Sequence, residues 1–126
     1  MTPVDPTLPY DDQNIFAKIL RGELPCTKVY EDEWAFAFLD INPQAPEHIL
    51  VLPKGAYVSW DDFSLKASDA EIAGFIRAIG TIAREKGLVE PGYRAIANVG
   101  HDSGQLVPHL HVHICGGRPL GRMIPA

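Results

Sequence analysis

Three of the five histidines in this chain stand at alternate positions, in the segment HLHVHIC at residues 109–115. Successive side chains of a β-strand point to opposite faces, so this spacing predicts a strand that buries Leu110, Val112 and Ile114 and lines its other face with imidazoles. Those imidazoles would lie about 6.6 Å apart along the strand, and each changes its charge near neutral pH. Histidine chemistry is therefore the first kind to consider.

Two kinds of chemistry suit such a row, and the bare sequence leaves both open. Neutral imidazole attacks phosphorus readily, so His111 could form a covalent intermediate while a second histidine protonates the leaving group. A zinc ion could instead bind two of the histidines, but it would need further ligands, for which His48 and Cys115 are the candidates. A third interpretation is a polar sheet face without a function. We favour phosphoryl chemistry and expect no metal and no cofactor.

The loop before the histidines has a composition that suits phosphate binding. Residues 98–105 read NVGHDSGQ and combine two glycines with the amide side chains of Asn98 and Gln105. Glycine lets the main chain approach a ligand closely, and main-chain N–H groups in such a turn can surround phosphate oxygens. A plain hairpin loop would have the same composition.

The elements that would position these residues define an α+β fold with a mainly antiparallel β-sheet meander. Apolar residues at helical spacing predict a short N-terminal helix within residues 12–22. A capping box at 68–71 begins one long helix, which should pack on the sheet and end at Gly87. Turn residues separate the expected strands, which are residues 28–31, 35–40, 48–53, 93–98 and 107–115.

Length, charge and composition limit the remaining possibilities. A chain of 126 residues suits a flexible proline-rich tail at 1–11 followed by a single domain at 12–126. The net charge of −5 weighs against nucleic-acid binding. Apolar runs are too short for a membrane span, and the first ten residues lack the features of a signal peptide. We therefore expect a cytoplasmic protein that binds neither nucleic acid nor membranes.

Residues 109–115 resemble the His-φ-His-φ-His-φ-φ signature of the histidine triad (HIT) family, in which φ is an apolar residue. The resemblance extends to Asn98 and residues 104–105, to DINPQAP at 40–46 with His48, and to NIF at 14–16. It is closest to the branch of small nucleotide-binding proteins that hydrolyse adenosine phosphoramidates. The resemblance implies a HIT-like fold, a purine nucleotide substrate and a homodimer.

The resemblance also implies a role for each matched histidine. His111 would attack the α-phosphorus and become a nucleotidyl-histidine, which water hydrolyses to release AMP or GMP. His113 would contact phosphate oxygens and assist the leaving group. His109 and His48 would belong to the supporting hydrogen-bond network.

Further matched positions imply a nucleotide pocket around these histidines. Asn98, Gly104 and Gln105 would surround the phosphate. Asp40 would bind the ribose hydroxyls, although an aspartate at this position could equally begin a turn. The apolar slot for the purine would be formed by Ile15, Phe16, Ile19, Phe38 and Ile41.

Three departures from the family pattern concern the substrate. Leu106 stands where close relatives carry serine or threonine, Ala56 stands where a further histidine is common, and residues 117–126 lack the Trp-Pro ending of the phosphoramidase branch. We expect a hydrolase that cleaves purine nucleoside phosphoramidates or related nucleotidyl conjugates through His111. The alternative is a nucleotide-binding interaction module with little or no catalysis.

Overall fold

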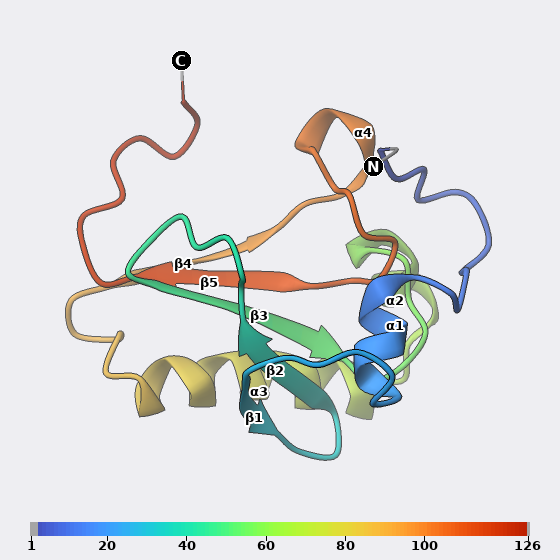
Figure 1. The fold of residues 1–126 in the computed structure, drawn as a ribbon, viewed down its shortest axis with the longest axis horizontal. Helices are drawn as coiled ribbons and strands as arrows, with labels where there is room; N and C mark the ends of the chain where they lie inside the picture. Colours follow the sequence, from blue (N-terminus) through green and yellow to red (C-terminus); the bar gives the residue numbers. More distant parts are fainter. Residues whose placement is uncertain (1–2, 126) are drawn as a thin grey trace.

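The computed structural model describes residues 3–125, and its centre is a five-stranded antiparallel sheet with helices on both faces (Figure 1). The strands are β1 (Lys28–Glu31), β2 (Ala35–Leu39), β3 (Glu47–Pro53), β4 (Tyr93–Ala97) and β5 (Val112–Gly116). The helices are α1 (Ile15–Leu20), α2 (Trp60–Lys66), α3 (Asp69–Glu85) and α4 (Gly100–Ser103). This arrangement confirms the predicted α+β class.

The strand order β1-β2-β3-β5-β4 decides which side chains meet at the site. The first three strands form the predicted meander, but β5 then inserts between β3 and β4, so the last strand of the chain lies inside the sheet. In the register of β3 with β5, His48 is opposite Cys115 and Leu50 is opposite His113. His48 and His113 are therefore diagonal neighbours on one face of the sheet.

Alternating side chains of the central strands divide the core into two layers. One layer lies between the sheet and α3 and contains Val51, Phe75 and Ile114. The other layer lies on the opposite face, beside α1, and contains Phe16 and Leu50. The period of two therefore places apolar packing against α3 and leaves the histidine face toward α1.

β5 is shorter than predicted, because it begins at Val112 and not at residue 107. Pro108 lacks the N–H that a strand ladder needs, and the N–H of Leu110 donates to the carbonyl oxygen of Tyr57 outside the sheet (2.8 Å). The predicted alternation still holds, since Leu110, Val112 and Ile114 are all buried in the layer against α3.

α3 begins with the predicted capping box, in which Ser68 and Glu71 each accept the other's main-chain N–H. Its two internal glycines differ in their surroundings. The ring of Trp34 lies where a Cβ of Gly74 would stand, whereas Gly80 faces only a flexible arginine side chain. Gly74 is therefore required by close packing between α3 and the start of β2.

Two helices fall outside the sequence predictions. α2 starts at a capping box formed by Ser59 and Asp62, a signal that the sequence does contain. α4 is a single turn within the predicted phosphate loop, and it ends at Gly104, whose φ of +82° favours glycine. None of the helices in the described part of the chain has the length and apolar content that a membrane span requires.

The N-terminal segment, for which flexibility is predicted above, has defined contacts from residue 4 onward. Val4 is buried, and its N–H donates to the carbonyl oxygen of Gln105 (3.0 Å). The ring of Pro6 lies close to Gly100, so the segment runs beside α4 (Figure 1). Residues 1–2 of the predicted tail, and residue 126 of the predicted domain, lie outside the described residues.

Candidate active site

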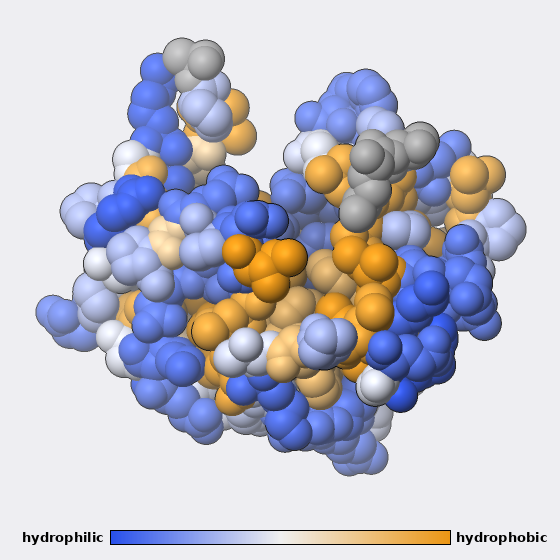
Figure 2. All heavy atoms as spheres, viewed as in Figure 1, coloured by the Kyte–Doolittle hydropathy of each residue, from blue (hydrophilic) through white to orange (hydrophobic). Residues whose placement is uncertain are grey.

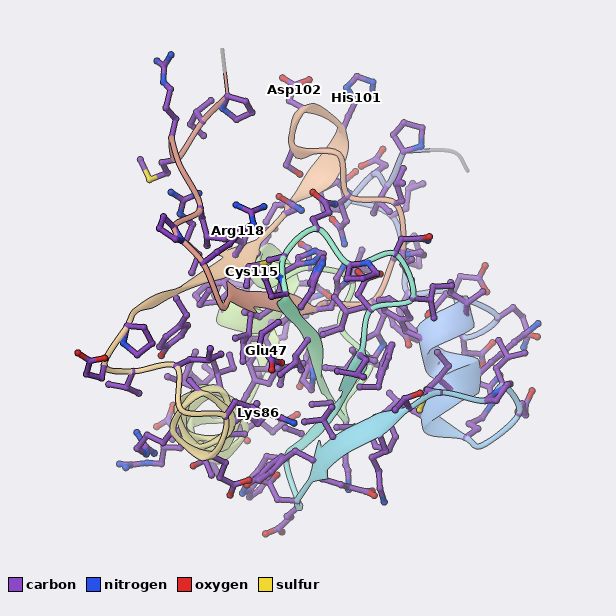
Figure 3. The ribbon with its side chains drawn as sticks, turned by 60° about the vertical axis from the view of Figure 1, so that its left-hand side comes forward. Glu47, Lys86, His101, Asp102, Cys115 and Arg118 are labelled. Carbon is purple, nitrogen blue, oxygen red and sulfur yellow. The ribbon has the colours of Figure 1, made fainter. Side chains whose placement is uncertain are left out.

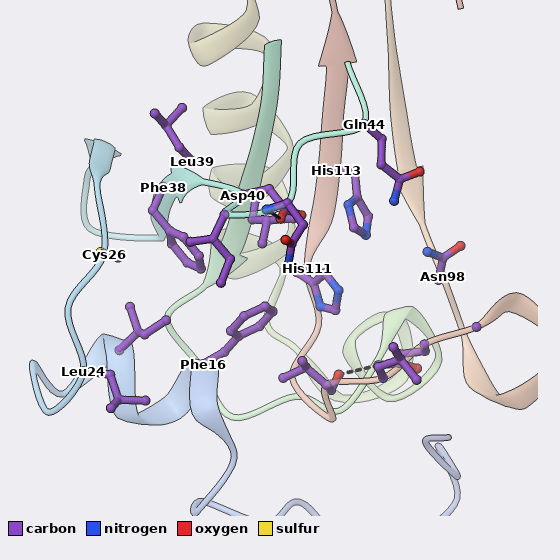
Figure 4. Close-up of a pocket in the computed structure, with 18 of the residues that line it drawn as sticks. Phe16, Leu24, Cys26, Phe38, Leu39, Asp40, Gln44, Asn98, His111 and His113 are labelled. Atoms are coloured by element: carbon purple, nitrogen blue, oxygen red, sulfur yellow. Dashed lines mark hydrogen bonds between the residues drawn. The ribbon is translucent and has the colours of Figure 1, made fainter. Parts of the chain in front are cut away.

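A cavity of about 550 Å³ opens on the histidine face of the sheet, in the size range of small-molecule sites (Figure 4). It brings together ten of the predicted site residues: Phe16, Ile19, Phe38, Asp40, Ile41, Asn98, Gly104, Gln105, His111 and His113. Among the described residues predicted for the site, Ile15, His48 and His109 do not line this cavity.

A main-chain hydrogen bond fixes which nitrogen of His111 can react. Nδ1 of His111 lies 2.7 Å from the carbonyl oxygen of His109, which can only accept, so Nδ1 carries the ring proton. The neutral ring therefore keeps an unprotonated Nε2 for a ligand in the cavity. Phe16 packs edge-on against the ring with centroids 4.9 Å apart and holds its orientation. This is the arrangement that a nucleophilic histidine requires.

A second chain of hydrogen bonds orients His113. The main-chain N–H of Gln44 donates to Nδ1 of His48 (3.0 Å), so the proton of neutral His48 is on Nε2. That N–H donates to Nδ1 of His113 over 2.9 Å. His113 therefore carries its own proton on Nε2, and its ring centroid lies 5.1 Å from that of His111. The cavity thus holds a nitrogen lone pair and an N–H donor side by side.

Burial favours the neutral forms of both rings. Desolvation lowers the pKa of His111 below its usual 6.5, and the His109 carbonyl and the Asp40 charge oppose this effect without reversing it. Desolvation, followed by the nearby His111 and His48 rings, lowers the pKa of His113 to about 4. His111 is therefore unprotonated at neutral pH, as a nucleophile must be.

Asp40 forms the turn that its sequence position allows, and it also lines the cavity. Its Oδ1 accepts the main-chain N–H of Asn42 (2.8 Å), which makes a turn after β2. Its Oδ2 lies 3.4 Å from Nε2 of His48, and the residue lines the cavity. A carboxylate has acceptor capacity for more than these two contacts, so Asp40 can also accept from ligand hydroxyls.

The side chain of Gln105 holds the loop together and is not available to a ligand. It accepts the N–H of Gly100 (2.9 Å) and donates to the carbonyl oxygens of Val58 (2.8 Å) and Val107 (3.1 Å). The residue is 1% exposed, so these three bonds use its amide. Gln105 therefore gives shape to the loop that carries Gly104.

The apolar end of the cavity lies between α1 and β2. Phe16 and Phe38 are buried there with ring centroids 5.6 Å apart. Ile41 is 90% exposed at the rim, and Ile15 is 40% exposed outside the lining. Figure 2 shows apolar side chains gathered at the centre of this face, between α1 and the loop after β2.

Several lining residues are missing from the sequence prediction: Leu24, Pro25, Cys26, Leu39, Asn42, Gln44, Leu50 and Val107. Leu106, named above as a departure from the family pattern, also lines the cavity. Leu50 could have been found, because it shares the face of His48 on β3 by the period of two. Leu24 and Cys26 lie in the irregular segment after α1, which carries no periodic signal.

His109 lies outside the cavity lining. It is 0% exposed, and desolvation lowers its pKa to about 4. Its Nε2 lies 2.9 Å from the carbonyl oxygen of Pro53, and its Nδ1 lies 2.6 Å from the hydroxyl of Tyr10. The sequence gives no sign of the Tyr10 contact, because that residue lies in the predicted tail.

Asp40, His48 and His113 offer possible metal ligands within 4.8 Å of one another. Their hydrogen bonds do not suit a metal ion, however. Nδ1 of His48 accepts an N–H from the main chain, so Nε2 must carry the proton and cannot bind a cation while His48 is neutral. The cluster is arranged to orient His113.

Comparison with known proteins agrees with this geometry. The profile of the family described as HIT domain matches residues 21–120. A 13.2 kDa HIT-like protein of Azospirillum brasilense is 64% identical over 115 residues, covering 91% of this chain and 94% of the relative. The purine nucleoside phosphoramidase of Escherichia coli (strain K12) is 42% identical over 113 residues, covering 90% and 94%.

Among solved structures, a HIT family hydrolase from Clostridium thermocellum superimposes with a TM-score of 0.78 at 37% identity, covering 90% of this chain and 98% of that chain. The chain therefore belongs to the HIT family, as its histidine signature predicts. Its fold is that of a HIT family hydrolase.

Proposed function

We propose that this protein hydrolyses purine nucleoside phosphoramidates, or related nucleotidyl conjugates, to AMP or GMP through a covalent intermediate on His111. The observation that carries the proposal is the pair of Nε2 atoms at one cavity, a lone pair on His111 and an N–H on His113. The purine nucleoside phosphoramidase of Escherichia coli supports the substrate class.

In the first step, the lone pair on Nε2 of His111 forms a bond to the α-phosphorus. The P–N bond breaks, and its electron pair leaves with the amine, which takes up a proton. A bound phosphate brings negative charge to His113 and raises its pKa, so this ring can take up a second proton and then supply its Nε2 proton to the amine, which leaves the ring neutral. In the second step, the oxygen of a water molecule forms a bond to the phosphorus and its proton goes to His113. The bond between the phosphorus and Nε2 of His111 breaks, which releases the nucleotide.

The rest of the cavity suits the remainder of a nucleotide. The rings of Phe16 and Phe38 offer apolar faces and edges for a purine, and Ile19 lies on the same side. Asp40 can accept the ribose hydroxyls between the base and the phosphate. Asn98 is a polar side chain at the histidine end of the cavity, where the phosphate would lie (Figure 4).

The experiment combines turnover with intact-mass analysis. Wild type, His111→Ala and His113→Ala are incubated with a fluorogenic adenosine phosphoramidate and quenched without acid. We expect rapid release by wild type, a loss of about 10³-fold or more in His111→Ala, and an AMP-sized adduct on His111 in the slow His113→Ala variant. Undiminished turnover by folded His111→Ala would reject the nucleophile.

His101→Ala is the matched control, because His101 lies on α4 with its side chain directed away from the rest of the molecule (Figure 3). It should keep wild-type turnover.

Leu106 lines the cavity without a hydroxyl, and this favours the second candidate, a nucleotide-binding module. That candidate predicts AMP binding with no release and no adduct in any variant.

The proposed homodimer has support from the two sheet edges. β1 carries Lys28 and Glu31, which pair with each other over 3.2 Å, and such charges discourage pairing with another strand. β4 forms the other edge, where Ile96 is 37% exposed. A second copy could pair along β4, and sedimentation of wild type against Ile96→Lys tests this: only the variant should sediment as a monomer.

We further propose a cytoplasmic location and no partner among nucleic acids or membranes. The net charge of −5 supports the absence of a polyanionic partner. Fractionation of cells that produce the protein tests the location.

A further inference from the structure

The hydroxyl of Tyr10 contacts the histidine row from outside the cavity. It lies 2.6 Å from Nδ1 of His109, and the two rings meet edge to face with centroids 5.6 Å apart. The other ring nitrogen, Nε2, faces the carbonyl oxygen of Pro53, which can only accept. Nε2 of His109 therefore carries the proton, Nδ1 accepts, and Tyr10 is the donor.

The hydrogen bond from Tyr10 holds the residue that orients His111. His109 is 0% exposed, so in this structure its ring nitrogens depend on protein groups for their hydrogen bonds. The main-chain carbonyl of the same residue accepts the Nδ1 proton of His111 over 2.7 Å. A shift of the His109 ring and backbone would weaken the bond that keeps Nε2 of His111 unprotonated.

The segment that carries Tyr10 is attached to the site at two other points. The N–H of Val4 donates to the carbonyl oxygen of Gln105, whose side chain holds the phosphate loop together. Phe16, which follows Tyr10 in the chain, packs against the ring of His111. Tyr10 precedes residues 21–120, which match the HIT domain profile, so this support comes from outside the matched region.

We propose that Tyr10 is a positioning residue of the active site, which acts through His109 to hold the His111 imidazole with Nε2 toward the cavity. This inference rests on the proposed function, in which His111 is the nucleophile. Burial raises the pKa of the Tyr10 phenol, which therefore keeps the proton that this hydrogen bond needs.

The test variant is Tyr10→Phe, which keeps the ring contact with His109 and removes only the hydroxyl. We expect kcat to fall about tenfold while KM stays within about twofold, because the groups that touch the substrate remain. The control is Tyr30→Phe, which removes a hydroxyl that donates to Asp32 (2.8 Å) at the β1 edge of the sheet. This control should keep both constants.

Nitrogen-15 spectra of the imidazoles, recorded without substrate, keep the test independent of the proposed activity. Wild type should show His109 protonated on Nε2 and His111 on Nδ1, and Tyr10→Phe should show His111 as a mixture of the two tautomers. These spectra report on Tyr10 even if no phosphoramidate is cleaved. In that case the proposed function fails. The hydrogen-bond chain is still supported if His111 has a single tautomer in wild type and a mixture of tautomers in the variant.

Three results would overturn the inference. One is an unchanged kcat in Tyr10→Phe with an active wild type. Another is a reduced kcat with unchanged His111 signals, because Tyr10 would then act by a different route. The third is protonation of His109 on Nδ1 in wild type, and this measurement decides the question even if Tyr10→Phe does not fold.

Discussion

Acidification should inactivate this protein at a lower pH than an exposed histidine nucleophile would allow. A histidine with the ordinary pKa of about 6.5 is only about 9% unprotonated at pH 5.5. Desolvation lowers the pKa of His111, and the opposing contributions of the His109 carbonyl and Asp40 are smaller. We therefore expect kcat/KM at pH 5.5 to stay well above about 9% of its highest value.

The assay is kcat/KM for a fluorogenic adenosine phosphoramidate between pH 4.5 and 7.5 at constant ionic strength. This parameter reports the pKa values of the free enzyme, in which the burial of His111 is the one described above. His111→Ala is measured in parallel, because its rate gives the spontaneous acid hydrolysis to be subtracted. Far-ultraviolet circular dichroism at each pH shows that lost activity is not lost structure.

An acid limb with an apparent pKa of 6.5 or above would refute this reasoning. It would mean that the nucleophile is solvated, or that a group other than His111 controls the reaction. A limb below 6.5 that persists in His101→Ala would agree with the buried position of His111, which is 8% exposed.

Three further predictions concern binding and stability. Asp40→Asn should raise KM about tenfold or more for a ribose-containing substrate. It should also move the acid limb to lower pH, because the Asp40 carboxylate raises the pKa of His111. Kinetic measurements with the ribose and dideoxyribose forms of the substrate check both effects. Gly74→Ala should lower the free energy of unfolding by about 1–3 kcal/mol through its clash with Trp34, whereas Gly80→Ala should raise it by about 0.5–1 kcal/mol; urea unfolding compares them. The folded-state pKa of His109 is about 4, below its unfolded value, so its contribution is complete above about pH 6.5 and declines toward pH 4. Protonation of His109 should therefore make the free energy of unfolding about 2 kcal/mol lower at pH 5 than at pH 7, and His113, whose pKa is also about 4, adds to the difference in the same direction. Equal stabilities at the two pH values would contradict the burial of these rings in neutral form.

The periodic parts of the fold were predictable from the sequence for a local reason. The inward side chains of the histidine segment, Leu110, Val112 and Ile114, follow from the period of two, and the capping box of α3 specifies where that helix starts. The start of β5 was placed too early because Pro108 and the bond from Leu110 to Tyr57 end the ladder at Val112. That bond joins residues far apart in the chain, so no local pattern indicates it.

The arrangement of the site was predictable only in part, because it depends on strand order. Alternation places His111 and His113 near one face, but the insertion of β5 beside β3 brings His48 within 2.9 Å of His113. The family resemblance supplied this neighbour, whereas periodicity alone did not. Tyr10 had neither signal, since it lies in an irregular proline-rich segment.

The hydrogen bonds around the triad show why its proton arrangement depends on the backbone. The tautomer of His111 is fixed by the carbonyl of His109, that of His109 by the carbonyl of Pro53, and that of His48 by the N–H of Gln44. Main-chain groups keep their donor or acceptor character under any substitution, proline aside. Neighbouring side chains can therefore change without changing which nitrogen of His111 is unprotonated, provided that the backbone stays in place. A substitution at another position that changes the tautomer of His111 must therefore move the main chain near His109, whose ring accepts a hydrogen bond from Tyr10.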